Sequence, residues 1–324
     1  MSEARSSAAA ARPSLRPAQA LAWVRSWSVY LAFAALVLFD LVVTPGFHQL
    51  GVVRSLLFES APVILIALGQ SLAIGTRGID LSVGSVMALS SAVVGITLTL
   101  GQGASMLLGI GAGLGCGIVN GLLIAILRID PLISSLSLLV AARGLAQALL
   151  GGARADLPFD GPLAWLGQAT LWMLPVTALI ALAVAVLFSF IVRRTTPGHY
   201  AIFAGASRTA AYLAGQPVRA TLLFVYGLSG MLAGIAGLFA TTRLGAADPN
   251  YIGVQFELDA IAAVVIGGTP LSGGRVSTVG TICGVLLLEV LDASFIMNNV
   301  SATYAQMIKA AFIIGALYLQ RAGG

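Results

Sequence analysis

The sequence predicts an all-α, polytopic membrane protein with about ten transmembrane segments, some of them half-spanning, and with both termini in the cytoplasm. Three observations predict this. Hydrophobic residues make up 58% of the 324 residues and charged residues only 9%, whereas about 25% charged residues is usual in soluble domains. Long apolar runs recur along the chain. The arginines concentrate on one side of the topology that these runs define.

Residues 1–26 are expected to form a cytoplasmic tail. From Ser2 to Gln19 this tail is rich in Ala, Ser and Arg, a composition that predicts disorder. It has no short apolar core followed by a small-residue cleavage site, so no signal peptide is expected. Residues 27–320 form the expected transmembrane domain, with a cytoplasmic loop at about 193–219, and residues 321–324 form a cytoplasmic C-terminus.

Ten apolar runs are expected to cross or enter a hydrocarbon core of about 30 Å. They lie at about residues 27–45, 60–76, 82–101, 104–127, 131–150, 169–192, 220–242, 257–268, 277–297 and 303–320. The run at 257–268 is short for a full span and ends in Gly267-Gly268, so we expect a half-helix there. The chain contains 38 glycines, and such small residues let membrane helices approach closely.

The positions of the arginines set the expected orientation. With the N-terminus inside, the outer side receives only Arg54, Arg154 and Arg243, and Arg143 falls within the fifth run. The cytoplasmic side receives Arg5, Arg12, Arg16, Arg25, Arg77, Arg128, Arg193, Arg194, Arg208, Arg219, Arg275 and Arg321. This asymmetry follows the positive-inside rule, and it accounts for the net charge of +5 without nucleic-acid binding.

The stretch Gly75–Ser85 interrupts two apolar runs with an arginine, an aspartate and glycines. Backbone or charge placed in hydrocarbon costs several kcal/mol unless protein or water satisfies it. The break therefore marks a membrane boundary or a lined cavity. Asp80 or Ser82 is suited to accept hydrogen bonds from the free amides of the next helix, expected from Leu81 to about Leu100.

Within the loop at 193–219, residues 207–215 form a short Ala-rich segment. The segment predicts a helix of about two turns. It is too polar to cross the membrane and too small to be a domain. Its size and position suit docking into a groove on a cytoplasmic partner, and a plain connector is the alternative.

A third stretch, residues 256–275, resembles the first break in its order of features. Glu257 and Asp259 open an apolar segment, where carboxylates favour a helix N-terminus. A polar turn closes it. Many transporters contain internal repeats with interrupted helices near the transport path. The residues of the turn that carry the pattern are Gly267, Gly268, Gly273, Gly274 and Arg275.

Together these motifs resemble the permease subunits of ribose-type sugar ABC importers over residues 55–320. The matching residues include Gly78, Asp80 and Gly84 in the first break, Asn120-Gly121, the Ala210-Ala211 pair with Gly215, and the stretch from Glu257 through Arg275. The segment 198–215 is longer than in the ribose permease and is similar to that of galactofuranose-type permeases. The family often has an acidic residue at the position of Thr209.

The resemblance implies a multi-pass protein of the bacterial inner membrane that works as a dimer with a second permease copy. A cytoplasmic sugar-type ATPase and a periplasmic sugar-binding protein are the other implied partners, besides membrane lipid. The implied contact with the ATPase is made by Arg208, Thr209, Ala210, Ala211 and Gly215. The chain has no phosphate-cradling Gly-rich motif, so we expect no enzyme activity and no cofactor on it, and ATP and magnesium on the partner.

Asp80, Ser82 and Asn120 are the residues expected along the substrate path, although helix capping or an interhelical hydrogen bond explains them equally well. Glu257 and Asp259 are interpreted as caps or loop contacts in preference to sugar ligands. Arg143 faces the protein interior or pairs with an acid. No metal site is expected, because the two histidines are far apart and Cys116 and Cys283 lie in apolar surroundings. The sequence does not identify the sugar.

An ion-coupled secondary transporter of a small polar solute is the alternative function. Such a transporter needs acidic groups within its spans. Asp40, Glu289 and Asp292 fall near or within expected spans, and the last two share one helix face.

Overall fold

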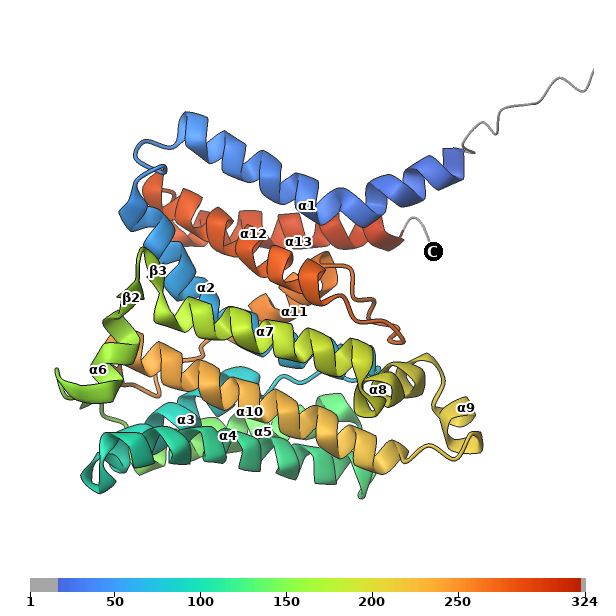
Figure 1. The fold of residues 1–324 in the computed structure, drawn as a ribbon, viewed down its shortest axis with the longest axis horizontal. Coiled ribbons are helices and arrows are strands. Elements are labelled where there is room, and N and C mark those ends of the chain that lie inside the picture. The colour runs from blue at the N-terminus through green and yellow to red at the C-terminus, as the bar shows by residue number, and fades with distance from the viewer. Residues whose placement is uncertain (1–16, 322–324) are drawn as a thin grey trace, which may run out of the picture.

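The computed structural model describes residues 17–321. Helices form almost all of this region (Figure 1). The helices are α1 (Pro17–Val43), α2 (Leu50–Gly75), α3 (Val83–Ile96), η1 (Leu98–Leu100), α4 (Gln102–Ala125), α5 (Pro131–Leu149), α6 (Gly161–Gln168), α7 (Val176–Arg194), α8 (Thr196–Ala206), α9 (Arg208–Leu213), α10 (Val218–Leu244), α11 (Phe256–Ile266), α12 (Thr278–Met297) and α13 (Ala302–Arg321). The strands are β1 (Ala155–Asp156), β2 (Thr170–Leu171), β3 (Leu174–Pro175) and β4 (Ala246–Ala247), with β1 antiparallel to β4 and β2 antiparallel to β3.

The all-α, polytopic class predicted from the sequence is confirmed. Within residues 17–321, six helices are long and apolar enough to cross a membrane: α2, α4, α5, α7, α10 and α12. The other four expected segments coincide with α1, α3, α11 and α13. At about 1.5 Å per residue, the 14 residues of α3 and the 11 of α11 are too short for a full span. The total of about ten spans stays a prediction.

Several helix boundaries differ from the expected ones. Helix α1 begins at Pro17, inside the expected tail, while residues 1–16 and 322–324 of the expected termini lie outside the described residues. Helix α7 begins at Val176 and not at 169, because residues 170–175 form the β2–β3 hairpin. Helix α3 ends at Ile96, and a 3₁₀ turn then leads to Gly101 at φ +96°, a conformation that favours glycine.

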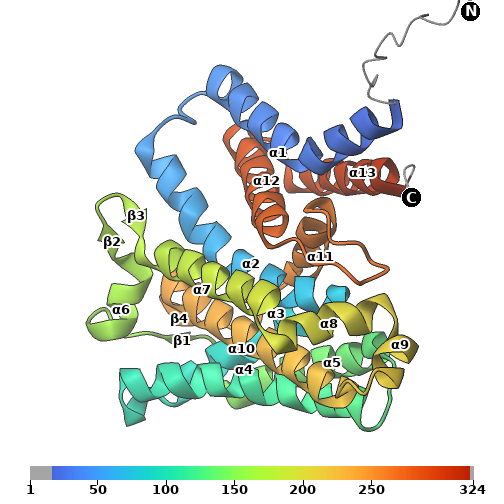
Figure 2. The ribbon, with the colours of Figure 1, turned by 45° about the vertical axis from the view of Figure 1, so that its right-hand side comes forward.

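The helices form two groups on either side of α2 (Figure 2). One group contains α1, α11, α12 and α13, and the other contains α3, α4, α5 and α10. Helix α10 packs against α2, α3 and α4. A Cβ on Gly113 of α4 would lie 2.6 Å from the carbonyl oxygen of Gly230 on α10. The two backbones therefore touch, which is the close packing that small residues permit between membrane helices.

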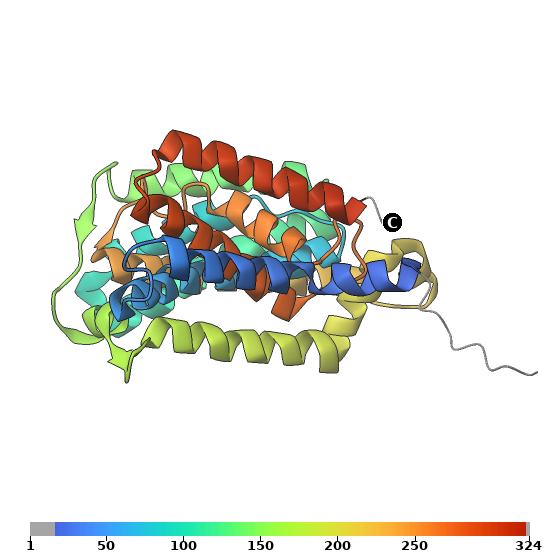
Figure 3. The same ribbon diagram turned by 90° about the horizontal axis from the view of Figure 1, so that it is seen from above.

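The long helices run in similar directions, as α1, α7 and α13 show when the molecule is seen from above (Figure 3). Helices α8 and α9 lie at one end of the molecule, and α6 with the β2–β3 hairpin lies at the other (Figure 1). Helix α1 begins and α13 ends at the same end as α8 and α9. This arrangement agrees with the orientation inferred from the arginines.

Candidate functional site

The first helix break lies between Gly75, where α2 ends, and Val83, where α3 begins. Arg77 adopts φ +62° in this turn. Asp80 Oδ1 accepts hydrogen bonds from the Ser82 amide at 3.1 Å and from Ser82 Oγ at 2.6 Å. The two polar residues that the sequence singled out are therefore bonded to each other at the start of α3.

Asp80 also joins two helices directly and a third through Asn120. Its Oδ2 accepts a hydrogen bond from Ser229 Oγ of α10 at 3.0 Å, and its Oδ1 accepts one from Asn120 Nδ2 of α4 at 3.4 Å. Asn120 Oδ1 in turn accepts one from Ser134 Oγ of α5 at 2.6 Å. We call Asp80, Ser82, Asn120, Ser134 and Ser229 the Asp80 cluster. All five are buried, so the cluster satisfies polar groups that are costly to bury alone.

Burial in the connection between α2 and α3 raises the pKa of the Asp80 carboxyl, whereas the hydrogen bonds from Ser82 and Ser229 favour its charged form. The hydroxyl of Tyr226 lies close to Gly78, so a Cβ at Gly78 would collide with it. This hydroxyl is buried and has no hydrogen-bond partner within residues 17–321. Packing therefore requires glycine at position 78. The turn also lies next to the Tyr226 hydroxyl, a donor without an acceptor in the described residues.

The sequence placed Asp80, Ser82 and Asn120 on the substrate path, and the structure brings all three together. In this conformation all three side chains are buried. Ser134, Ser229 and Tyr226 were not singled out from the sequence. Their only signal was a polar group inside an apolar helix, which such helices tolerate when a neighbouring helix supplies a partner.

The second break precedes α11, and its turn contains Gly253 at φ +73° and Gln255 at φ +69°. Arg143 of α5 holds this turn through three carbonyl oxygens. Its Nη1 donates to Pro249 O at 2.8 Å and to Ile252 O at 2.7 Å, and its Nη2 donates to Gly253 O at 3.1 Å. Arg143 therefore faces the protein interior, and its charge also interacts with the carboxylate of Glu257, so the structure excludes neither of the two roles left open for it.

The two breaks meet at Gly84 and Gly253. A Cβ on Gly84 would collide with the carbonyl oxygen of Gly253 and with the carboxylate of Glu257, and a Cβ on Gly253 would collide with Gly84 O. Glu257 Oε2 is buried and lacks a hydrogen-bond partner in the described part of the chain. Asp259 has a different role, because its Oδ1 pairs with Lys309 Nζ of α13 at 2.8 Å. Both carboxylates lie in the first turn of α11, whose N-cap residue Gln255 makes no side-chain capping hydrogen bond.

The turn that follows α11 contacts the first helix break through hydrogen bonds. Gly274 N donates to Gly75 O at 2.9 Å, and Arg77 donates to Ser272 O at 2.7 Å and to Ala206 O at 2.6 Å. Arg275 is exposed.

Each of the four glycines singled out in this turn has a structural reason. Gly267 packs against Gly280 of α12, and the other three have positive φ angles, where a side chain is strained. Those three are Gly268, Gly273 and Gly274.

The predicted cytoplasmic helix is α9, which Ser207 caps by accepting a hydrogen bond from Ala210 N at 3.2 Å. Ala211 is fully buried, whereas Tyr212 is 77% exposed and Leu213 is 80% exposed. The helix lies at one end of the molecule (Figure 1). It therefore exposes a large aromatic and a large aliphatic side chain, as a docking element does.

The remaining residues of the expected contact with an ATPase surround this tip. Arg208, Thr209 and Ala210 are exposed. Gly215 has φ +71°, which suits the left-handed residue that ends many helices.

Comparison with known proteins identifies the family. The family model for "Branched-chain amino acid transport system / permease component" matches residues 52–317. The chain belongs to this permease family. No solved structure matches the chain.

Three relatives of the permease are named for sugars. The galactofuranose transporter permease of Escherichia coli (strain K12) is 35% identical over 94% of this chain and 92% of its own length. A fructose import permease of Bifidobacterium longum (strain NCC 2705) is 34% identical over 91% of this chain and 87% of its own. The ribose import permease of Escherichia coli (strain K12) is 32% identical over 91% and 94%. The resemblance to sugar-importer permeases is thereby confirmed.

The permease is a transport component and not itself an enzyme, and its family implies a multi-pass protein of the inner membrane. The family also implies an ATPase and a periplasmic binding protein as partners. Two of the acids that kept the ion-coupled alternative open have partners. Asp292 Oδ2 accepts from Lys309 Nζ at 2.8 Å, and Asp40 Oδ1 accepts from Ser294 Oγ at 2.7 Å.

Proposed function

We propose that this chain is the permease subunit of an ABC importer that moves a monosaccharide across the bacterial inner membrane. The observation that carries the proposal is the meeting of two interrupted helices beside the buried Asp80 cluster, in a permease whose relatives are named for galactofuranose, fructose and ribose. Interrupted helices in transporters lie near the transported solute.

The proposed substrate path passes Asp80, Ser82 and Asn120. Their carboxylate, hydroxyl and amide groups are the kinds of donor and acceptor that bind sugar hydroxyls. The described conformation covers them, so the path opens only when the helices around the cluster separate. Only three polar side chains are proposed to touch the sugar, and so few contacts hold it loosely, which favours its release.

The proposed driving movement enters through α9. A short segment ending at Pro217 connects α9 to α10, and α10 carries Ser229 of the Asp80 cluster. A displacement of α9 by a partner ATPase is therefore transmitted along one continuous helix to the cluster. ATP and magnesium act on the partner, and we propose no cofactor on this chain. Such rigid-body movements are a common form of switching.

We further propose a homodimer of two permease copies, surrounded by lipid. Apolar side chains are exposed along α5, including Leu136 and Val140, and the membrane or the second copy covers them. The proposed domains are the cytoplasmic tail at 1–26, the transmembrane permease domain at 27–320 with its coupling loop at about 193–219, and the short C-terminus.

The test is reconstitution of the permease with its ATPase and binding protein in liposomes. Uptake of labelled ribose, fructose and galactofuranose and the rate of ATP hydrolysis are measured together. The proposal expects uptake that needs ATP and the binding protein and that survives the collapse of ion gradients by ionophores. Uptake that follows an ion gradient without ATP would overturn it.

A further inference from the structure

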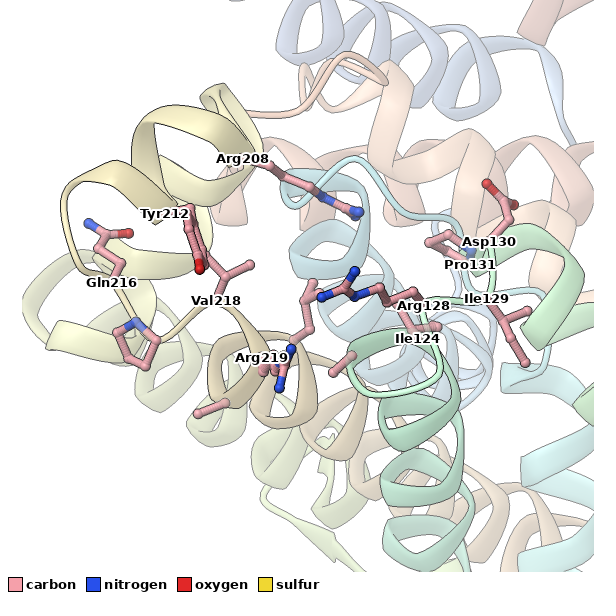
Figure 4. Close-up of a pocket in the computed structure, with 14 residues that line it drawn as sticks. Ile124, Arg128, Ile129, Asp130, Pro131, Arg208, Tyr212, Gln216, Val218 and Arg219 are labelled. Carbon is pink, nitrogen blue, oxygen red and sulfur yellow. The ribbon is translucent and has the colours of Figure 1, made fainter.

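A pocket of about 910 Å³ lies beside α9, separate from the Asp80 cluster. It is bounded by α9, the start of α10 and the turn that joins α4 to α5 (Figure 4). Three arginines line it, each from a different one of these elements: Arg208, Arg219 and Arg128. The proposed transport mechanism uses Arg208 and Tyr212 on α9 and makes no use of the other residues that line this pocket.

The positive charge of the pocket is only partly offset within the described chain, because three arginines and one carboxylate line it. None of the three arginines forms an ion pair with another of residues 17–321, and Arg208 makes only a long contact of 3.5 Å with Thr76 O. One acid, Asp130, lines the pocket, and its carboxylate accepts a hydrogen bond from the Leu132 amide at the start of α5. A bound anion would relieve the repulsion among the like charges.

Arg128 occupies a position that usually favours another residue. Its φ is +58°, and it follows the end of α4, where glycine is the common choice. The side chain nevertheless points toward the open space of the pocket, as the guanidinium of Arg208 does (Figure 4). Strained backbone of this kind concentrates at binding sites.

The pocket is also larger than a bare inorganic anion requires, and its volume is that of a site for a small organic ligand. Gln216 contributes an amide oxygen that is buried and has no partner in the described chain, and Tyr212 adds a hydroxyl. Such groups pair with the hydroxyls of a polyol. Guanidinium groups bind phosphate in a bidentate, charge-assisted manner.

We infer that this pocket binds a phosphomonoester with a hydroxyl-rich body, such as a sugar phosphate, from the cytoplasm. The phosphate lies among Arg128, Arg208 and Arg219, and the body lies toward Gln216 and Tyr212. The inference goes beyond the proposed transport function and does not depend on it.

The test measures binding to the purified full-length permease by calorimetry, with ribose 5-phosphate and fructose 1-phosphate as probes and the parent sugars and inorganic phosphate for comparison. We expect saturable binding of the sugar phosphates, weaker binding of inorganic phosphate, and none of the parent sugars. The double variant Arg128→Gln/Arg219→Gln should bind at least about tenfold more weakly, because each lost arginine removes a charge-assisted contact.

The matched control is Arg193→Gln/Arg194→Gln, which removes the same charge from two exposed residues at the end of α7, outside the pocket. It should bind as the unaltered protein does. The variant Arg128→Lys/Arg219→Lys keeps the charge but loses the planar fork, and it should bind with intermediate affinity, which also shows that substitution at these sites preserves the fold.

A second arm uses permease in nanodiscs made with or without phosphatidylglycerol. If this lipid blocks sugar-phosphate binding only while Arg128 and Arg219 are present, the site is supported and a lipid headgroup supplies the phosphate. Absence of binding by every phosphate probe overturns the inference, as does equal weakening in both glutamine double variants. The inference is also overturned if the Arg128→Gln/Arg219→Gln variant binds the sugar phosphates as tightly as the unaltered permease but no longer copurifies with the ATPase. The two arginines would then contact the ATPase and not a phosphate. Each arm measures binding and none measures transport. A failure of sugar import would therefore not affect the interpretation of the binding results.

Discussion

Ser229 on α10 donates a 3.0 Å hydrogen bond to the carboxylate of Asp80, which lies 149 positions earlier in the chain. This bond links the first helix break to α10, which packs against α2, α3 and α4. Both residues are buried, Ser229 completely and Asp80 with 2% of its surface exposed. A buried carboxylate that loses a donor keeps its cost of desolvation.

Ser229→Ala should therefore lower the free energy of unfolding by about 1–3 kcal/mol and reduce uptake. Ser137→Ala is the matched control, because Ser137 lies on α5 with an exposed hydroxyl bonded only to its own helix. Thermal unfolding in detergent and uptake in liposomes check both variants. Equal stability of the two would show that the bond to Asp80 contributes nothing.

Arg143→Met should loosen the turn at 249–253, since three carbonyl oxygens lose their donors. The loss of hydrogen bonds from a charged group is worth about 1.5–3 kcal/mol each in favourable cases. Hydrogen exchange of the amides in this turn should become faster. Arg154→Gln, which removes an exposed arginine paired with Asp156, should leave that exchange unchanged, and a similar effect of both variants would contradict the prediction.

Gly84→Ala should disable the permease, because the new Cβ would meet the Gly253 carbonyl and the Glu257 carboxylate. The control is Gly103→Ala on α4, where nothing lies within 4 Å of the added carbon and alanine favours the helix by up to about 1 kcal/mol. Yield of folded protein and uptake are the measurements. Full uptake by Gly84→Ala would mean that the two breaks do not need to touch.

Leu213→Asp should release the ATPase without unfolding the permease, because Leu213 is 80% exposed at the tip of α9. Thr209→Glu should be tolerated, since Thr209 is exposed in the first turn of α9, where a carboxylate favours a helix N-terminus. Copurification of the ATPase with each variant measures the effect, together with thermal unfolding of the permease alone. Retention of the ATPase by Leu213→Asp would remove α9 from the contact.

Neutralising Glu289 and Asp292 together, as Glu289→Gln/Asp292→Asn, should leave ATP-driven uptake within about twofold of the original. Lys309 keeps its second partner, Asp259, at 2.8 Å, so α13 stays attached to α11. Uptake is followed with ATP and, separately, with an imposed ion gradient. Loss of uptake that depends on the gradient would revive the ion-coupled alternative, which needs such acids.

The helices of this fold were predictable because long apolar runs carry their own signal, and each expected run coincides with a helix. The hairpin at 170–175 was missed because its residues are also apolar, and Trp172 reverses the chain at φ +60° without a glycine to mark it. Of the candidate site, the sequence identified Asp80, Ser82 and Asn120. It could not show that Ser229 or Arg143 completes the site, because their partners depend on how distant helices pack.

The backbones of α4 and α10 touch along a row of glycines and not at one point. Gly113 meets Gly230, Gly117 meets the carbonyl oxygen of Tyr226, and Gly121 meets Leu223. On the 27-residue α10, positions 223 to 230 of this row are about 10 Å apart at about 1.5 Å per residue. The two helices would therefore tilt together as one rigid pair, and a small tilt would narrow the bundle at one membrane face while it widens the bundle at the other.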